Sequence, residues 1–233
     1  NVATSDAALV ARLRAAGAVI WGKTNVPFAS YDWQTTSPTD PRANNPRDVG
    51  YGPGGSSGGS AAALAAGITP LELGSDVAGS VRNPASACGV VGLRPSEGLL
   101  SSSGHGRMPG VAHAMRSLAT PSPMARNISD LRTIFAVLRG PDPHEPRLPW
   151  RPLVAPAPAR AVRGLRIGYF HRVGEVEPAA EVLRAFEAAL DRLRTAGAVV
   201  EEADLGRAVD LTRTHAAWGT IQGFEIRHSA PFL

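Results

Sequence analysis

Two short runs of glycine and serine carry the side chains of this sequence that could do chemistry. The first is GPGGSSGGS at residues 52–60, and the second is GSDVAGS at residues 74–80. Serine supplies a hydroxyl that can act as a nucleophile or relay a proton. Glycine permits tight turns and close backbone approach, and consecutive backbone N–H groups beside a serine are what an oxyanion hole requires. Acyl transfer is therefore one chemistry that these runs could support.

Three interpretations of the two runs compete. A flexible linker fits poorly, because the runs are short and lie against apolar, patterned segments. A phosphate-binding nest lacks an adjacent lysine to neutralise the charge. A serine-hydrolase elbow is the third, since residues 54–58 and 55–59 both match GxSxG, but the preceding residues 48–53 (DVGYGP) make a poor strand. The elbow also needs a histidine, and no sequence context singles out any of the six, which are His105, His113, His144, His171, His215 and His228.

The octapeptide GAVIWGKT at residues 17–24 matches the phosphate-loop template and holds the only lysine of the chain, Lys23. A phosphate loop follows a strand and opens a helix. Here the order is inverted, because residues 5–16 have helical spacing and residues 18–22 are predicted to form a short buried strand. Pro27 also falls where the following helix should begin its second turn. The pattern does not favour a nucleotide site.

Length and composition exclude several classes of protein. With 233 residues, of which 43% are hydrophobic, the chain can form one or two globular domains with a sizeable core. No run approaches the roughly 18 apolar residues of a membrane span. The single cysteine, Cys88, fits a reducing compartment, so a cytoplasmic protein is predicted. The net charge is +4, but the arginines are scattered without aromatic interleaving, and nucleic-acid binding is not predicted.

Helices alternate with short apolar strands along the chain, which is typical of an α/β layer architecture. Residues 140–163 contain many prolines and are predicted to form a loop across the surface of a single domain. The predicted helices cover residues 5–16, 61–66, 129–138 and 178–196, and the predicted strands cover residues 18–22, 69–73, 90–94, 165–170 and 198–202.

Three segments together resemble the amidase signature family. They are residues 54–60 (GGSSGGS), 73–84 (LGSDVAGSVRNP) and 88–95 (CGVVGLRP), within a signature core at about residues 52–98. The GKTN turn at residues 22–25 also resembles the family's approach to the signature. The likeness is strongest over residues 1–98 and looser to about residue 202. It implies a mixed sheet flanked by helices, with residues 1–233 forming a partial, incomplete single domain.

The resemblance implies a Ser–Ser–Lys triad, one of the serine-lysine variants of acyl-transfer machinery. Ser80 matches the family nucleophile, and Ser56 matches the bridging serine, which follows a cis peptide bond, here Gly55–Ser56. The two hydroxyls are expected within hydrogen-bond distance of each other. The backbone N–H groups expected to form the oxyanion hole belong to Val77, Ala78 and Gly79.

Neighbouring residues are assigned supporting roles with an alternative for each. Asp76 and Arg82 flank the nucleophile and form either a supporting ion pair or a plain solvated pair. Ser57 either supports the site or forms the turn. Ala78 stands where the family usually has glycine, so a positive φ there would strain the backbone.

The family lysine would fall before residue 1, and Lys23 matches a structural turn, so Lys23 is interpreted as a bystander. The 233 residues alone are accordingly expected to lack activity. The parent protein is expected to hydrolyse a small-molecule carboxamide without metal or organic cofactor, away from membranes and nucleic acid, with a homodimer as a possible assembly. The alternatives are the amidase subunit of a tRNA-dependent amidotransferase and a catalytically inactive binding protein.

Overall fold

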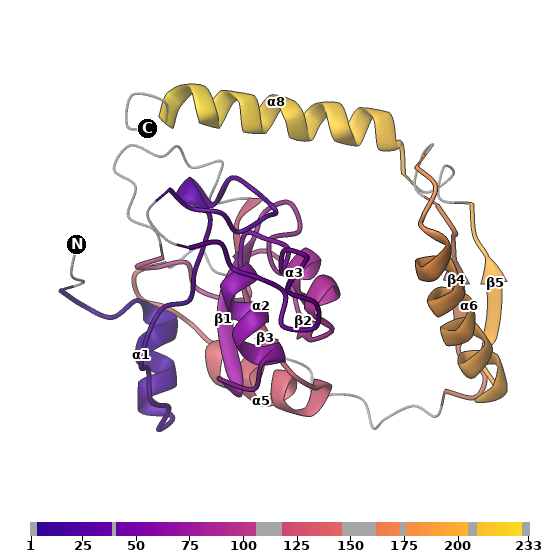
Figure 1. Ribbon diagram of the computed structural model, residues 1–233, viewed down its shortest axis with the longest axis horizontal. Coiled ribbons are helices and arrows are strands. Elements are labelled where there is room, and N and C mark those ends of the chain that lie inside the picture. The colour runs from indigo at the N-terminus through magenta and orange to yellow at the C-terminus, as the bar shows by residue number, and fades with distance from the viewer. Residues whose placement is uncertain are drawn as a thin grey trace. The chain divides into compact units, whose positions relative to one another are not determined.

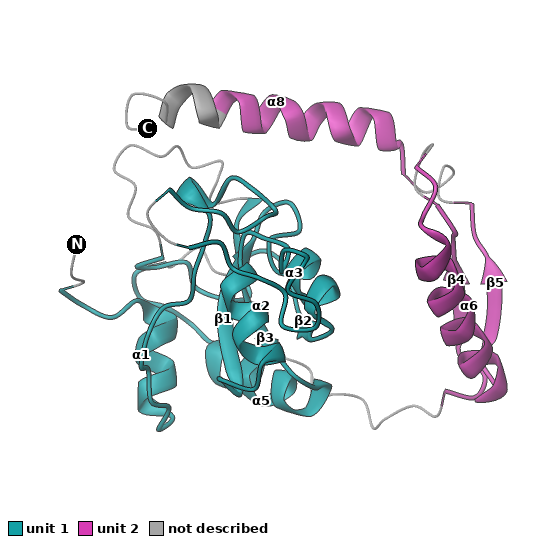
Figure 2. Cartoon of the chain, in the orientation of Figure 1, with its two compact units in different colours: residues 1–151, 227–233 teal, residues 152–226 magenta. Residues whose placement is uncertain are grey.

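The chain divides into two compact units. The computed structural model describes residues 4–38, 41–105, 118–145, 162–172, 176–204 and 209–229, the last five by their backbone alone. One unit comprises residues 1–151 with 227–233, and the other comprises residues 152–226 (Figure 2). The boundary falls within the proline-rich segment, of which residues 146–161 lie outside the described residues. That the chain forms one incomplete domain stays a prediction.

The first unit is built around a three-stranded antiparallel sheet in the order β1–β3–β2 (Figure 1). Helices precede, separate and follow its strands. The strands are β1 (Leu71–Asp76), β2 (Val91–Gly92) and β3 (Thr120–Ala125). The helices are α1 (Ala8–Ala15), α2 (Gly58–Ala65), α3 (Arg82–Cys88) and α5 (Ile128–Leu138), with a single 3-10 turn, η1 (Phe28–Ser30).

Each face of this sheet contributes to a different hydrophobic cluster. Successive side chains of a strand point to opposite faces, and in β3 Met124 joins one cluster while Ala125 joins the other. The Met124 cluster includes residues of α2 (Ala61 and Leu64) and of α3 (Ala85 and Cys88), together with Val81 directly before α3. The Ala125 cluster includes Leu9 of α1, residues of α5 (Leu131, Ile134 and Leu138) and the loop residue Leu100. The sheet is therefore covered on both sides, and β1 runs between the two clusters into the second glycine-serine run.

Strand β3 occupies the centre of the sheet although it contains two prolines, and the sequence pattern did not predict it. The Leu93 N–H donates to the Pro123 C=O at 3.0 Å. Since the N–H and C=O of one residue point to the same side of a strand, the missing N–H groups of Pro121 and Pro123 face the side of β2, which has only two residues. The long β1–β3 ladder is left intact.

Residues 18–22 do not form the short buried strand that was predicted. The structure has them in irregular conformation, with Val19 84% and Trp21 71% exposed. Their residue types favour a strand, but no described strand pairs with them, and pairing decides whether such a propensity is realised. No helix follows at Lys23 either, so the phosphate-loop template has neither of its flanking elements.

The second unit contains a β–α–β arrangement. Strands β4 (Arg166–Tyr169) and β5 (Val199–Glu202) are parallel, and α6 (Ala180–Thr195) lies between them in the chain. These three elements agree with the predicted strand, helix and strand. Helix α8 (Leu211–Ser229) follows and was not predicted, because its sequence has weak apolar periodicity. Among the described helices, none is both long enough and apolar enough to cross a membrane.

His171 links all three elements of this β–α–β arrangement. Its Nε2 lies 2.5 Å from Glu187 Oε1 on α6, and its Nδ1 lies 3.3 Å from Glu202 Oε1 on β5. Hydrogen bonds to Glu187 and then Glu202 raise the pKa of His171 above its ordinary value of 6.5. A raised pKa means that the folded state binds the His171 proton more tightly than the unfolded state does. The resulting stabilisation of the folded state is complete below pH 6.5 and is lost as pH rises through the folded pKa.

We expect His171→Gln to remove this pH dependence. Urea denaturation between pH 5.5 and 8.5 should show the variant less stable than the wild type on the acidic side, with the two curves converging above the folded pKa. His215→Gln is the matched control, because His215 has no carboxylate partner among the described residues. Equal pH profiles for wild type and His171→Gln would contradict the prediction.

Candidate active site

The two glycine-serine runs lie directly against each other. The Ser57 N–H donates to the Ser80 C=O at 2.9 Å. The Gly55–Ser56 peptide bond is cis, as the resemblance implies. Ser56 and Ser57 are each only 5% exposed, whereas Ser80 is half-buried. Residues 24 positions apart in the sequence, Ser56 and Ser80, are thus brought to one site.

The first run is held by contacts to segments far from it in sequence. The Thr35 hydroxyl donates to the Gly54 C=O at 2.7 Å, and the Gly55 N–H donates to Asn83 Oδ1 at 3.1 Å. A Cβ atom at Gly58 would lie 2.1 Å from Thr35 Oγ1, and one at Gly59 would lie 2.4 Å from Asn25 backbone atoms. These glycines are therefore required for close approach of the surrounding chain.

Ser57 contributes more than turn formation. Its N–H holds the Ser80 carbonyl, and its side chain lies so close to β1 that a Cβ at Gly74 would be 2.4 Å from Ser57 Oγ. The residue therefore fixes the first run against the strand that leads to the second. This arrangement favours the supporting role over simple turn formation.

Asp76 at the end of β1 organises the second run. Its carboxylate is fully buried and accepts backbone N–H groups from Gly79 at 2.8 Å and from Val81 and Arg82 at 3.2 Å. The Arg82 guanidinium adds two hydrogen bonds, at 3.0 and 2.9 Å. Burial would raise the pKa of Asp76, but the hydrogen bonds from Arg82, Gly79 and Val81 outweigh it and lower the pKa from 3.8 to about 2. Asp76 and Arg82 thus form an ion pair whose carboxylate is buried.

A second arginine, to which the sequence pattern assigned no role, also reaches Asp76. Arg94 Nε lies 3.6 Å from the Asp76 carboxylate and donates to its backbone C=O at 3.3 Å. Arg94 Nη2 donates to the Leu118 C=O at 3.0 Å. Arg94 therefore ties the end of β1 to the residues just before β3.

The oxyanion-hole assignment needs one correction. The Gly79 N–H donates to Asp76 and is not free, so it does not fit the predicted role. The N–H groups of Val77, Ala78 and Ser80 have no hydrogen-bond partner among the described residues. The positive φ of this turn, 103°, belongs to Gly79, while Ala78 is not among the residues with positive φ. Alanine is therefore accommodated at position 78 without the strain that was considered.

The two serine hydroxyls have no side-chain hydrogen-bond partner in the described part of the chain, and the expected bond between them is not formed. None of the described histidine side chains forms a hydrogen bond with either serine. The residues before Gly54 form only an isolated bridge, Asn45 with Asp48, rather than a strand. The serine-hydrolase elbow therefore lacks its structural context.

Cys88 has a structural environment. It is fully buried at the end of α3, and its Sγ donates to the Pro53 C=O at 3.4 Å. Burial raises the pKa of the thiol, against an opposing effect of the Arg47 charge. The nearby helix end is capped by Asn45 Nδ2, which donates to the Ala87 C=O, and by Arg47 Nε, which donates to the Cys88 C=O.

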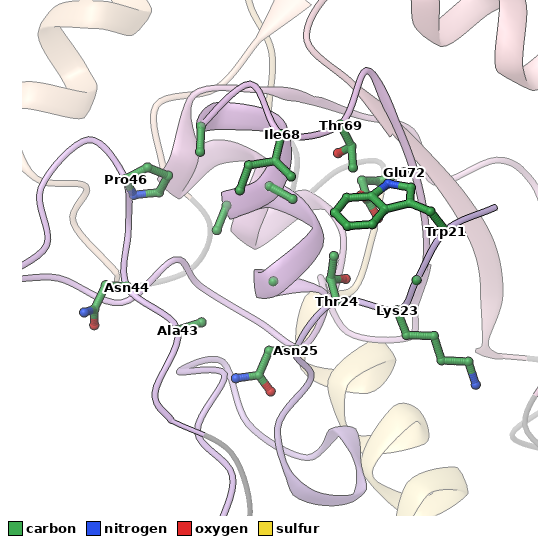
Figure 3. A pocket seen from close by; sticks show the side chains of 15 residues that line it. Trp21, Lys23, Thr24, Asn25, Ala43, Asn44, Pro46, Ile68, Thr69 and Glu72 are labelled. Atoms are coloured by element: carbon green, nitrogen blue, oxygen red, sulfur yellow. The ribbon is translucent and has the colours of Figure 1, made fainter. Parts of the chain in front are cut away.

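The GKTN turn braces helix α2 beside a cavity of about 470 Å³ (Figure 3). The Thr24 and Ser60 hydroxyls are 2.7 Å apart, and the Gly59 N–H donates to the Asn25 C=O at 3.1 Å. Lys23 is exposed, and Figure 3 shows its side chain extending away from α2. Neither Ser56 nor Ser80 lines this cavity. These contacts agree with a structural turn and provide no buried position for the Lys23 amine.

The chain matches the family model named Amidase over residues 1–229. This match, together with the paired serine runs, defines the class: the chain belongs to the amidase family.

The relatives include both amidotransferase components and hydrolases. The chain is 42% identical over 206 residues to a glutamyl-tRNA(Gln) amidotransferase subunit of Roseiflexus sp. (strain RS-1), covering 86% of this chain and 40% of the relative. It is 43% identical over 168 residues to the 1-carboxybiuret hydrolase component AtzE of Pseudomonas sp. (strain ADP), covering 71% and 35%. The chain thus spans about two fifths of the length of these curated relatives.

Solved structures of amidotransferase subunits and hydrolases also match this chain in fold. The 6-aminohexanoate cyclic dimer hydrolase complexed with substrate matches with a TM-score of 0.74 at 34% identity, over 86% of this chain and 42% of that chain. The glutamyl-tRNA(Gln) amidotransferase subunit from Thermotoga maritima matches with a TM-score of 0.76 at 29% identity, over 98% and 54%. The mixed α/β architecture with its small sheets is therefore that of the amidase signature enzymes.

Proposed function

We propose that the protein to which this chain belongs is an amidohydrolase that cleaves a carboxamide C–N bond through a serine acyl-enzyme. The observation that carries the proposal is the junction of the two runs, where Ser57 N–H binds the Ser80 C=O beside three backbone donors that have no partner among the described residues. Such donors are positioned to bind a developing oxyanion. We assign Ser80 as the nucleophile, Ser56 as the bridging serine, and the N–H groups of Val77, Ala78 and Ser80 as the oxyanion hole.

In this mechanism the Ser80 oxygen attacks the amide carbon while its proton passes to Ser56 and then to a base. The carbonyl electron pair moves to the oxygen, which the backbone donors hold. The tetrahedral intermediate collapses by breaking the C–N bond, and the relayed proton is delivered to the leaving nitrogen. Water then cleaves the acyl-enzyme ester by the reverse route. The relay requires the Ser56 and Ser80 hydroxyls to approach each other, and catalytic hydrogen bonds commonly tighten only when substrate is bound.

The base that we propose is a lysine outside residues 1–233, as the resemblance implies, so the 233 residues alone are expected to be inactive. A lysine acts as a base only when burial or neighbouring positive charge lowers its pKa. The exposed position of Lys23 does not supply that environment. Lys23 therefore remains a bystander in this proposal.

The proposed substrate is a small-molecule amide. We also propose that the protein is located in the cytoplasm and that it can form a homodimer. The main alternative is the amidase subunit of a tRNA-dependent amidotransferase, which is supported by the curated relatives of that name. A catalytically inactive binding protein is the other alternative. Release of ammonia or amine from simple amides without a partner subunit would favour the amidohydrolase over both alternatives.

We expect Ser56→Ala in the full-length protein to lower kcat for amide hydrolysis by about 10²–10⁴-fold, the usual contribution of general acid–base assistance. The measurement is ammonia or amine release from a panel of small carboxamides. Lys23→Ala is the control and should retain kcat within about twofold, because Lys23 is exposed and lines a cavity that neither serine lines. A large loss in Lys23→Ala together with an active Ser56→Ala would contradict the assignment of both residues.

A further inference from the structure

Asn83 contacts both serine runs, in each case at the glycine before the serine. It lies in the first turn of α3, three residues after Ser80. Its backbone N–H donates to the Gly79 C=O at 2.7 Å, and its side-chain Oδ1 accepts the Gly55 N–H at 3.1 Å. Gly79 and Gly55 are the residues immediately before Ser80 and Ser56. A single residue therefore holds the Gly79–Ser80 peptide, directly before Ser80, and the Gly54–Gly55 peptide, one peptide before the Gly55–Ser56 bond.

The surroundings leave little freedom at this contact. A Cβ atom at Gly54 would lie 2.5 Å from Asn83 Oδ1 and 2.8 Å from Pro84 Cα, so the start of α3 sits directly on the Gly54–Gly55 turn. Gly54 itself has a φ of 78°, which favours glycine. Gly55 is buried, and its N–H would be left without a partner if Asn83 lost its oxygen. The contact thus needs an acceptor of this length at this position.

We propose that Asn83 is a positioning residue that fixes the separation and orientation of Ser56 relative to Ser80. This inference rests on the proposed function, in which a proton passes between these two serines. The hydrogen bond from the Ser57 N–H to the Ser80 C=O also links the runs but does not reach Gly55, and the Thr35 hydroxyl holds the Gly54–Gly55 peptide only through its C=O. Asn83 ties the N–H of this peptide to the segment that carries Ser80. Loss of its oxygen frees the Gly55 N–H, which lets Ser56 shift relative to Ser80, and misplacement of a reacting group by about 1 Å can lower a rate about 10²-fold.

The test compares Asn83→Ala, Asn83→Asp and Asn127→Ala in the full-length protein. Asn127 caps α5 by accepting the Asp130 N–H at 2.9 Å, so Asn127→Ala removes the same kind of bond at a helix remote in sequence from both serines. Asn83→Asp retains an oxygen acceptor. The readouts are kcat and KM for amide hydrolysis, the rate at which a fluorophosphonate labels Ser80, and the melting temperature.

We expect Asn83→Ala to lower kcat and the labelling rate about 10- to 100-fold with KM nearly unchanged. Asn83→Asp should recover most of the labelling rate, and Asn127→Ala should lower the melting temperature while labelling stays within about twofold. Unchanged labelling in Asn83→Ala, or an equal loss in Asn127→Ala, would overturn the inference.

A measurement without catalysis separates this inference from the proposed function. The Gly55 amide should be protected from hydrogen exchange in the wild type and in Asn83→Asp, and should lose protection selectively in Asn83→Ala. A wild type that neither hydrolyses amides nor reacts with the probe would refute the proposed function. Gly55 protection that is equal in the wild type and in Asn83→Ala would instead refute the role of Asn83.

Discussion

Ser80→Ala is expected to abolish amide hydrolysis and labelling by a fluorophosphonate, with kcat falling by at least about 10³-fold in the full-length protein. The Ser80 oxygen is the only atom in the proposed mechanism that forms a bond to the substrate carbon in the first step, so its removal ends covalent catalysis. The measurement is kcat for a small carboxamide together with mass spectrometry of the labelled peptide.

Ser86→Ala provides the matched control for this prediction. Ser86 lies on the same helix that follows the second run, but its side chain is exposed and forms no hydrogen bond with either serine. It should retain wild-type kcat within about twofold. Labelling of Ser56 or Ser57 in an active Ser80→Ala protein would reject Ser80 as the nucleophile and restore the GxSxG interpretation.

Asp76→Asn is expected to destabilise the protein by about 1–3 kcal/mol, because the amide nitrogen cannot accept the backbone N–H groups that the buried carboxylate accepts. The same change weakens the hydrogen bonds that hold the turn at Gly79, so kcat should also fall, by about 10²-fold. Urea denaturation and amide hydrolysis measure the two effects. Asp48→Asn is the control, since Asp48 is exposed and its side chain accepts only the Gly50 N–H, at 2.9 Å, among the described residues.

The pH dependence of the free energy of unfolding should show the contribution of the Asp76 carboxylate in a second, separate measurement. Its pKa is lowered to about 2 in the folded state from an ordinary value of 3.8. A lowered pKa means that the folded state favours the ionised form, so the stabilisation is complete above about pH 4 and is lost as pH falls toward 2. Each pKa unit corresponds to about 1.4 kcal/mol, so the loss should be about 2 kcal/mol. An acid limb identical in wild type and Asp76→Asn would contradict this.

The sequence predicted those elements whose local pattern agrees with their final environment. Helices α5 and α6 have clear apolar periodicity and lie close to the predicted ranges, and Asn127 caps α5. Strand β3 was missed because Pro121 and Pro123 remove N–H groups that a central strand normally uses. Helix α3 was missed because it is short and contains Pro84, and the strand predicted at residues 18–22 was wrong because its propensity has no pairing partner among the described strands.

The candidate site was predictable only where the motif itself carries the chemistry. The serines, the cis peptide bond and the Asp76–Arg82 pair lie within one continuous signature. The contribution of Thr35 depends on a distant loop folding onto Gly54, and no spacing in the sequence signals that contact. The engagement of the Gly79 N–H by Asp76 depends on the path of the turn, which residue types alone do not determine.

The burial of Cys88 makes the reactivity of its thiol a measure of local opening of the structure. Its thiol donates to the Pro53 carbonyl, directly before the first glycine-serine run, and it is the only cysteine in the 233 residues. A thiol reagent can therefore react within these residues only when the packing between α3 and that run opens. The rate of modification under native conditions measures the free energy of that opening at a single defined point, in the way that amide exchange does for the backbone. Ligands that order the serine runs would slow the reaction in proportion to how tightly they close them.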